Sequence, residues 1–258
     1  MKTIFALSGV VIKELYRRKD FYVLFIITIL ICLVMASVNV FNDDKIVRYL
    51  KEICLLLIWL ASLVIAITTT ARQIPAEREQ RTLLPLLAKP ITRAQLIIGK
   101  FLGCWFACGL TLFCFYVFFA ALAASREHHL PLLNYFQAAA LHWVVLGVVV
   151  AMTLFGSLVF AAPSSNATII FVFVAGILTI GRHLHQIALG QPEPAQSIIY
   201  AIYLVIPHLE IFDVRDLIVH DWPVVPWFYF GMAVLYALAY IAAFLIAACL
   251  VFRRKAVN

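Results

Sequence analysis

The chain has 258 residues, of which 65% are hydrophobic and only 13% are charged. Ordinary soluble domains are closer to half apolar and one quarter charged. With a mean hydropathy of +1.01, this excess of apolar side chains excludes a soluble globule, a disordered chain and a collagen-like fibre. The composition predicts an all-α polytopic membrane protein that forms a single transmembrane domain over residues 1–258.

Residues 1–20 are predicted to form an amphipathic helix that lies in the membrane interface. Its apolar side contains Leu7, Val11 and Leu15, and the basic residues at its end would lie near anionic lipid head groups. The alternative is a short tail that frays in the cytoplasm. No cleavable small-residue site accompanies the basic cluster, so a signal peptide is not expected here.

Six further stretches are long and apolar enough to cross about 30 Å of hydrocarbon as helices. In chain order, these predicted transmembrane helices cover residues 21–40, 53–71, 96–124, 138–162, 167–187 and 227–252. The stretch 188–226 includes a mostly apolar run that is too short to cross, so we expect an extracytoplasmic re-entrant segment there. The predicted turn at 163–166 carries no charge, and the number six therefore depends on length and parity.

The charges of the loops predict the orientation, because cytoplasmic loops of membrane proteins carry an excess of Lys and Arg. With both termini in the cytoplasm, fourteen of the 20 Lys and Arg residues lie on the cytoplasmic side, and nine of the 13 acids lie outside. The net charge of +7 therefore reports topology and gives no indication of nucleic-acid binding. We expect a multi-pass protein of the cell inner membrane.

The stretch 72–95 is the only long cytoplasmic loop between predicted transmembrane helices. Its polar first half, from Glu77 to Arg81, is followed by four leucines. Prolines divide it into short helical pieces, and Thr92 is placed to cap the next helix. Because four leucines exposed to water would be unfavourable, the loop is expected to dock on a partner protein or on the chain's own helix ends.

This loop resembles the loop of ABC-2 type transporter permeases, with the pattern E-R-E-x-x-T-L-x-x-L-L-A-x-P-I-T-R-x-x-x-I-x-G-K. The matching positions are Glu77, Glu79, Thr82, Leu83, Leu86, Leu87, Pro90, Ile91, Arg93, Gly99 and Lys100. The resemblance implies a cytoplasmic coupling helix, between the second and third transmembrane helices, that sits in a groove of a partner ATPase. The residues implied to face this partner are Glu77, Arg78, Glu79, Arg81, Thr82 and Leu83.

The resemblance implies the permease subunit of an ATP-driven transporter, expected to be an exporter with alternating access. The chain lacks a P-loop, so we expect no enzymatic activity and no cofactor or metal site of its own. ATP and Mg would be bound by two copies of a separate ABC ATPase. A second permease chain completes the implied assembly, and a homodimer is expected, although the residues leave a sister chain open.

Other functions and partners remain as alternatives. Some permeases of this family serve the maturation of an extracytoplasmic metalloenzyme, and all seven histidines here lie outside the predicted cytoplasmic segments. An extracytoplasmic partner is also one interpretation of the acidic face in 206–216, beside a solvated surface and a gate. A secondary transporter would usually carry acids in mid-membrane, and none lies there. An intramembrane metalloprotease would need H-E-x-x-H, which the sequence lacks.

Overall fold

The computed structural model describes residues 2–17, 19–37, 44–79, 92–124, 131–160, 162–189 and 206–254, with a few single residues between 196 and 203. Within these ranges every regular element is a helix. The expected all-helical class is therefore confirmed.

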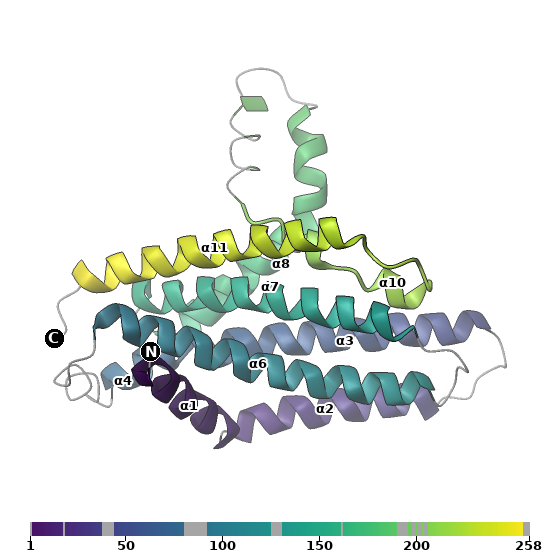
Figure 1. Ribbon diagram of the computed structural model, residues 1–258, viewed down its shortest axis with the longest axis horizontal. Coiled ribbons are helices and arrows are strands. Elements are labelled where there is room, and N and C mark those ends of the chain that lie inside the picture. The colour runs from purple at the N-terminus through teal and green to yellow at the C-terminus, as the bar shows by residue number, and fades with distance from the viewer. Residues whose placement is uncertain are drawn as a thin grey trace.

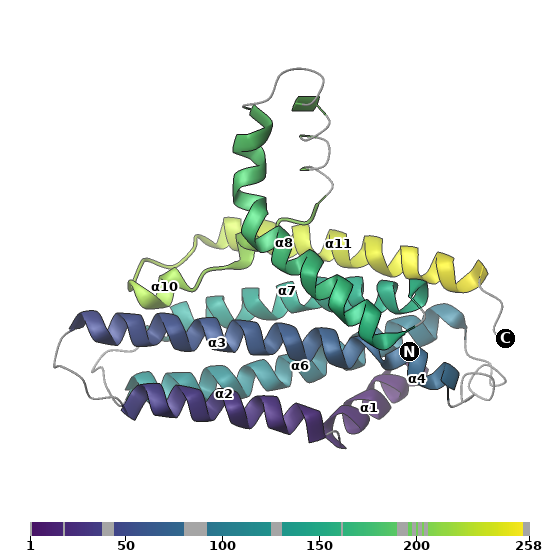
Figure 2. The same ribbon diagram turned by 180° about the vertical axis from the view of Figure 1, so that it is seen from behind.

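Four long helices form the body of the protein. They are α3 (Asp44–Ala71), α6 (Arg93–Ala124), α7 (Leu132–Val159) and α11 (Trp227–Arg254). Figures 1 and 2 show them side by side in an elongated bundle, with α6 running opposite to the other three. This arrangement follows from their composition, because helices that are apolar on most of their surface must pack on one another or face lipid.

The helix α7 lies at the centre of the bundle and packs against α3, α6, α8 and α11. In the most apolar 18-residue stretch of α7, 72% of the residues are buried inside the protein, whereas in that of α11 only 17% are buried. The fully buried run from Val148 to Leu154 is rich in small and β-branched residues. Such residues let neighbouring helices approach α7 closely. The helix α11, by contrast, has most of its surface facing away from the other helices.

A pair of tryptophans fixes α6 to α7. The indole N–H of Trp105 donates to the carbonyl of Trp143 at 2.9 Å, and the indole of Trp143 donates to the carbonyl of Trp105 at 3.2 Å. The two rings are stacked with centroids 4.7 Å apart. Gly109 and Gly147 provide the space, since a Cβ at Gly147 would lie 2.8 Å from the Trp105 nitrogen and one at Gly109 would overlap the Trp143 ring.

The N-terminal helix α1 (Lys2–Arg17) packs across α6 and precedes α2 (Lys19–Ser37). The contact is closest at Gly103, where a Cβ would lie 2.7 Å from the Cβ of Val11. On its other side α1 presents Phe5 and Val10, which are 65% and 64% exposed. The apolar residues of α1 therefore lie on two faces. One face, with Val11, packs on α6, and the other, with Phe5 and Val10, is exposed.

The helix α8 (Pro163–Leu189) begins earlier than expected. The predicted turn at 163–166 is its first helical turn, which corrects the sequence interpretation. Proline is favoured at the first position of a helix because its missing N–H would be unpaired there. Asn166 is fully buried and donates to the carbonyl of Thr153 on α7 at 3.1 Å. The later half of α8 stands away from the bundle (Figures 1 and 2).

Two short helices close one end of the bundle, η1 (Leu209–Phe212) and α10 (Asp216–Val219). Asn134 of α7 donates to the carbonyls of Leu217 and Trp222 at 3.2 and 2.8 Å. Gln137 exchanges two hydrogen bonds with the backbone of Val225, both at 2.9 Å. The first turns of α7 therefore hold most of the segment before α11 in place.

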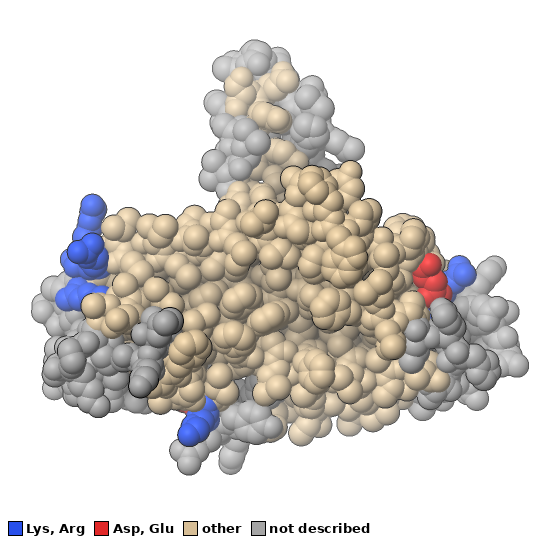
Figure 3. Space-filling view, in the orientation of Figure 1, with Lys and Arg blue, Asp and Glu red and all other residues tan. Residues whose placement is uncertain are grey.

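On the face seen in Figure 3, charged side chains gather mainly toward the ends of the bundle and leave its middle uncharged. Figure 3 shows blue atoms over the start of α6 and the end of α11, a further blue patch near α1, and red atoms mainly at the opposite end. In the described part of the chain, four helical stretches are long and apolar enough to cross a membrane. They are Lys51–Glu77, Arg93–Ala124, Leu132–Val159 and Trp227–Arg254, while Phe25–Val34 and Pro163–Thr179 are shorter apolar stretches.

Candidate functional site

The described start of the predicted coupling loop is a short helix, α4 (Gln73–Glu79), that follows α3 almost without interruption. Only Arg72 separates the two helices, and its carbonyl still accepts a helical hydrogen bond from the N–H of Ala76 at 3.0 Å. Gln73 and Ile74 are buried against the bundle. The two helices are therefore joined by an almost continuous helical backbone.

A buried lysine attaches α4 to α6. The Lys100 ammonium lies 2.7 Å from Oε1 of Glu77, and the side chains of the two residues are 3% and 21% exposed. It also donates to the backbone carbonyl and to the side-chain oxygen of Gln73, at 3.1 and 3.2 Å. A buried charge is tolerated only when it is paired and hydrogen-bonded, and this ammonium has three oxygen partners.

The far end of the loop is attached to α6 and α11. Thr92 and Gln95 form a capping box, in which each side chain bonds the backbone N–H of the other, at 3.2 and 3.1 Å. The Arg93 guanidinium donates to the carbonyls of Phe252 and Arg253 at 2.6 and 3.3 Å, and lies 5.4 Å from the centre of the Phe252 ring. The residues on both sides of 80–91 are thus anchored to the bundle.

The residues predicted to face a partner differ in their surroundings. Glu77 is directed toward Lys100, whereas Glu79 is exposed. Glu79 and Arg72 line a pocket of about 460 Å³ together with Ser164 at the start of α8. The side chain of Arg78 lies outside the described residues, as do Arg81, Thr82, Leu83, Leu86, Leu87, Pro90 and Ile91. No role of these residues is tested by the structure.

Among the remaining motif residues, Gly99 and Lys100 are buried and Arg93 is half-buried. Sequence reasoning did not single out Gln73, which supplies two of the three oxygens around Lys100. The signal was present in the spacing, since Gln73 and Glu77 are four residues apart and share one face of a helix. A lysine buried about two turns into a long apolar helix needs such a face opposite it.

A second polar cluster lies inside the bundle at the opposite end. His142 of α7 is 2% exposed, and its Nε2 lies 2.8 Å from the Ser62 hydroxyl while its Nδ1 lies 3.4 Å from the Tyr116 hydroxyl. Ser62 already donates to the carbonyl of Trp59 at 2.9 Å. The consistent assignment is therefore a neutral imidazole that donates from Nε2 to Ser62 and accepts at Nδ1 from Tyr116. His142 is therefore buried in the core of the bundle.

An ion pair beside this cluster orders the segment before α11. The Arg215 guanidinium donates to both carboxylate oxygens of Asp213 at 2.7 and 2.9 Å, and lies 5.7 Å from the ring of Trp59. These hydrogen bonds to Asp213 raise the pKa of Arg215 above its ordinary value. In the described residues, no group of three or more His, Cys, Asp or Glu residues could hold a metal ion.

The long apolar helices define the class of protein, which is a multi-pass helical membrane protein. Residues 10–257 match the family model described as ABC-2 family transporter protein, and the chain belongs to this family. A search of curated proteins found no match. Members of the family are membrane subunits of transporters, and an ABC ATPase is their general partner.

Proposed function

We propose that the chain is the permease subunit of an ATP-driven exporter in the cell inner membrane, with ATP hydrolysed by a separate subunit. The observation that supports this proposal is the attachment of the residues on both sides of 80–91. Before it, Glu77 on α4 is paired with Lys100 of α6, and after it, Arg93 at the start of α6 donates to a carbonyl of α11. A partner that pushes on this segment would therefore move α3, α6 and α11 together.

The coupling contacts are assigned to residues 78–83. Glu79, Arg78, Arg81, Thr82 and Leu83 face the ATPase in this proposal, and Glu79 is exposed as the contact requires. Glu77 has a different role, because its carboxylate is directed toward Lys100 and joins α4 to the bundle. Closure of two ATPase subunits would act on the two copies of the segment in a homodimer and favour one state of the helices.

The proposed topology has six transmembrane helices with both termini in the cytoplasm. Besides the four long stretches, α2 and α8 each contain an apolar stretch, which would supply the other two crossings. The helix α1 would lie in the cytoplasmic interface, with the exposed Phe5 and Val10 in contact with lipid. Basic residues at the end of α11 agree with this orientation, because cytoplasmic helix ends are enriched in Lys and Arg.

The proposal is tested by co-expressing the chain with its ATPase and measuring co-purification and ATP hydrolysis. We expect Glu79→Ala to weaken docking of the ATPase or its stimulation, because this carboxylate is exposed at the coupling segment. The matched control is Glu52→Ala, which changes another exposed glutamate at the opposite end of α3. Equal co-purification and equal stimulation for the two variants would refute the coupling assignment.

Orientation is tested separately with a cysteine introduced at Gln80. In intact cells, a membrane-impermeant maleimide should label this cysteine only after the inner membrane has been opened. Labelling from outside would place the segment on the wrong side for an ATPase and would overturn the proposal.

A further inference from the structure

The pocket of about 460 Å³ beside Glu79 lies between α4 and the first turn of α8. One wall of it is formed by Arg72, Ala76 and Glu79, and the other by Pro163, Ser164 and Ala167. Figure 2 shows α4 and the start of α8 at the same end of the bundle. Because Glu79 and Ser164 are exposed, the pocket is open to the surroundings at this end.

Both walls of the pocket are fixed to the bundle. In the first turn of α8, the Asn166 side chain donates to the carbonyl of Thr153 on α7, and it lies so close to Gly156 that a Cβ there would overlap it. On the other side, α4 is held by the ion pair between Glu77 and Lys100. The pocket therefore needs little ordering when a partner enters it, and this lowers the cost of binding.

The lining of the pocket indicates what kind of group fits it. Ala76, Pro163 and Ala167 have compact apolar side chains, which leave space for a larger one. Arg72 and Glu79 bring one charge of each sign, so net charge does not select the occupant. Shape selects it instead, because a bulky side chain can bury its apolar body against the compact residues and keep a polar end at the rim.

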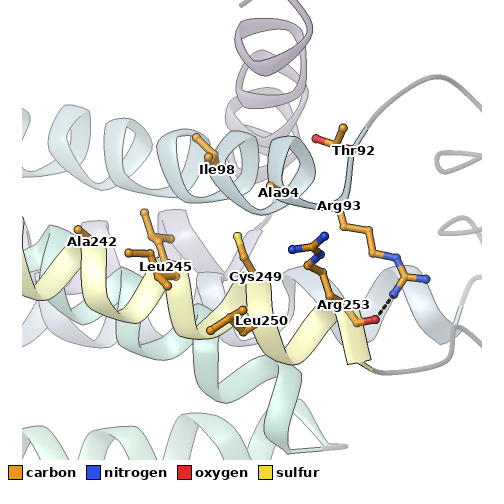
Figure 4. Close-up of a pocket in the computed structure, with 10 residues that line it drawn as sticks. Thr92, Arg93, Ala94, Ile98, Ala242, Leu245, Cys249, Leu250 and Arg253 are labelled. Atoms are coloured by element: carbon orange, nitrogen blue, oxygen red, sulfur yellow. Dashed lines mark hydrogen bonds between the residues drawn. The ribbon is translucent and has the colours of Figure 1, made fainter.

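A second groove at this end of the bundle, of about 710 Å³ between α6 and α11, has a different character (Figure 4). Most of its lining is aliphatic, including Ile98, Leu245 and Leu250. The Arg93 guanidinium at its end is engaged with the carbonyl of Arg253. Such a surface suits the hydrocarbon of the membrane. In the pocket beside α4, four of the seven lining residues are polar, and it is the one that a water-soluble protein can enter.

We propose that the pocket between α4 and α8 receives a bulky side chain of the partner ATPase, one with an apolar body and a polar end, as in arginine or tyrosine. This inference rests on the proposed function and adds to it a second contact surface, the first turn of α8. Glu79 is the last described residue before the segment 80–91, and it also lines the pocket. A protein seated on that segment therefore comes to lie beside the pocket.

The test measures the affinity of the ATPase for the full chain purified in detergent. Ser164 and Ser165 are adjacent exposed serines, and only Ser164 lines the pocket. We expect Ser164→Trp, which fills the pocket, to weaken binding at least about fivefold, and Ser165→Trp to stay within about twofold of wild type. Equal affinities for the two variants would overturn the pocket assignment.

The variant Glu79→Ala separates this inference from the proposed function. If it weakens docking while the two tryptophan variants bind equally, the coupling proposal stands and the pocket assignment falls. If neither Glu79→Ala nor Ser164→Trp has an effect, both are refuted.

A second measurement leaves the pocket open and so does not depend on how the tryptophan is accommodated. Ser164→Cys should react with a water-soluble maleimide, and bound ATPase should slow this reaction. The rate at Glu52→Cys, an exposed site at the opposite end of α3, should not change. Both rates are measured above the background of the six native cysteines. An unchanged rate at Ser164→Cys in the presence of bound ATPase would overturn the proposal.

Discussion

The ammonium group of Lys100 lies 2.7 Å from a carboxylate oxygen of Glu77, and this ion pair joins α6 to α4. Both residues belong to the sequence pattern that resembles the loop of ABC-2 permeases. The buried ammonium of Lys100 requires oxygen partners, and the partly exposed carboxylate of Glu77 supplies the charged one. Gln73 completes the site from the same face of α4.

We predict that Lys100→Met destabilises the fold by about 3 kcal/mol or less, because it leaves a partly buried carboxylate without its cation. Water can reach Glu77, which is 21% exposed, and this limits the loss. Thermal unfolding of the purified protein measures the effect. The control is Lys13→Met at an exposed lysine of α1, and an equal unfolding midpoint for both variants would contradict the prediction.

A glycine-to-alanine comparison tests the close contact between α1 and α6 at Gly103. Alanine stabilises a helix interior by about 1 kcal/mol relative to glycine when there is space for the methyl group. Gly176→Ala should therefore be neutral or stabilising, since nothing lies within 4 Å of the added Cβ. Gly103→Ala should instead destabilise and should increase proteolysis of α1, because its methyl group would meet Val11 at 2.7 Å. The prediction fails if the two variants behave alike.

The stacked indoles of Trp105 and Trp143 give a third prediction. Trp143→Phe removes an N–H that donates to the carbonyl of Trp105 and weakens the stacking, with an expected loss of about 1–3 kcal/mol. Chemical unfolding in detergent measures this loss. Trp227→Phe serves as the control because Trp227 is 57% exposed. This variant should lower the free energy of unfolding by only a small fraction of the loss expected for Trp143→Phe.

The fourth prediction concerns the pH dependence of the pair formed by Arg215 and Asp213. Because Asp213 raises the pKa of Arg215 in the folded state, the stability that this arginine contributes is fully present below the ordinary pKa of arginine. It is lost only as the pH rises through the still higher folded value. Limited proteolysis of the segment 206–226 should therefore proceed equally at about pH 7 and about pH 10.

Asp213→Asn removes the charged acceptor of both hydrogen bonds from Arg215. We expect faster cleavage of the segment 206–226 in this variant at both pH values. A wild-type protein that becomes sensitive between these pH values would show that another group holds the segment.

Much of the fold could be predicted from apolar run length alone. The runs at 96–124 and 227–252 lie within α6 and α11, because a helix in lipid must satisfy its own backbone hydrogen bonds over the full crossing. The start of α8 at Pro163 was missed, since an uncharged stretch gives no signal for where a turn ends. Asn166 is buried because it donates a hydrogen bond to the carbonyl of Thr153 on α7. A contact between two helices cannot be read from the sequence around Asn166 alone.

The contacts of the candidate site were harder to predict, for the same physical reason. The small-residue face at Gly99 and Gly103 predicts a close helix approach, but the sequence does not say that α1 is the neighbour. Likewise, the sequence around His142 does not indicate its burial, because its partners Ser62 and Tyr116 lie on other helices. Resemblance identified Glu77 and Lys100 as motif residues, whereas their mutual contact joins different helices and needed the structure.

The seat of α1 lies only one turn beyond Lys100 on α6, so two independent inputs converge on a single stretch of helix. One is the attachment of α4 through Glu77. The other is the contact of Val11 on α1 with Gly103, on the side of α1 away from the exposed Phe5 and Val10. If the proposed topology holds, a change in the membrane around α1 and a change at α4 would both act on this same stretch of α6.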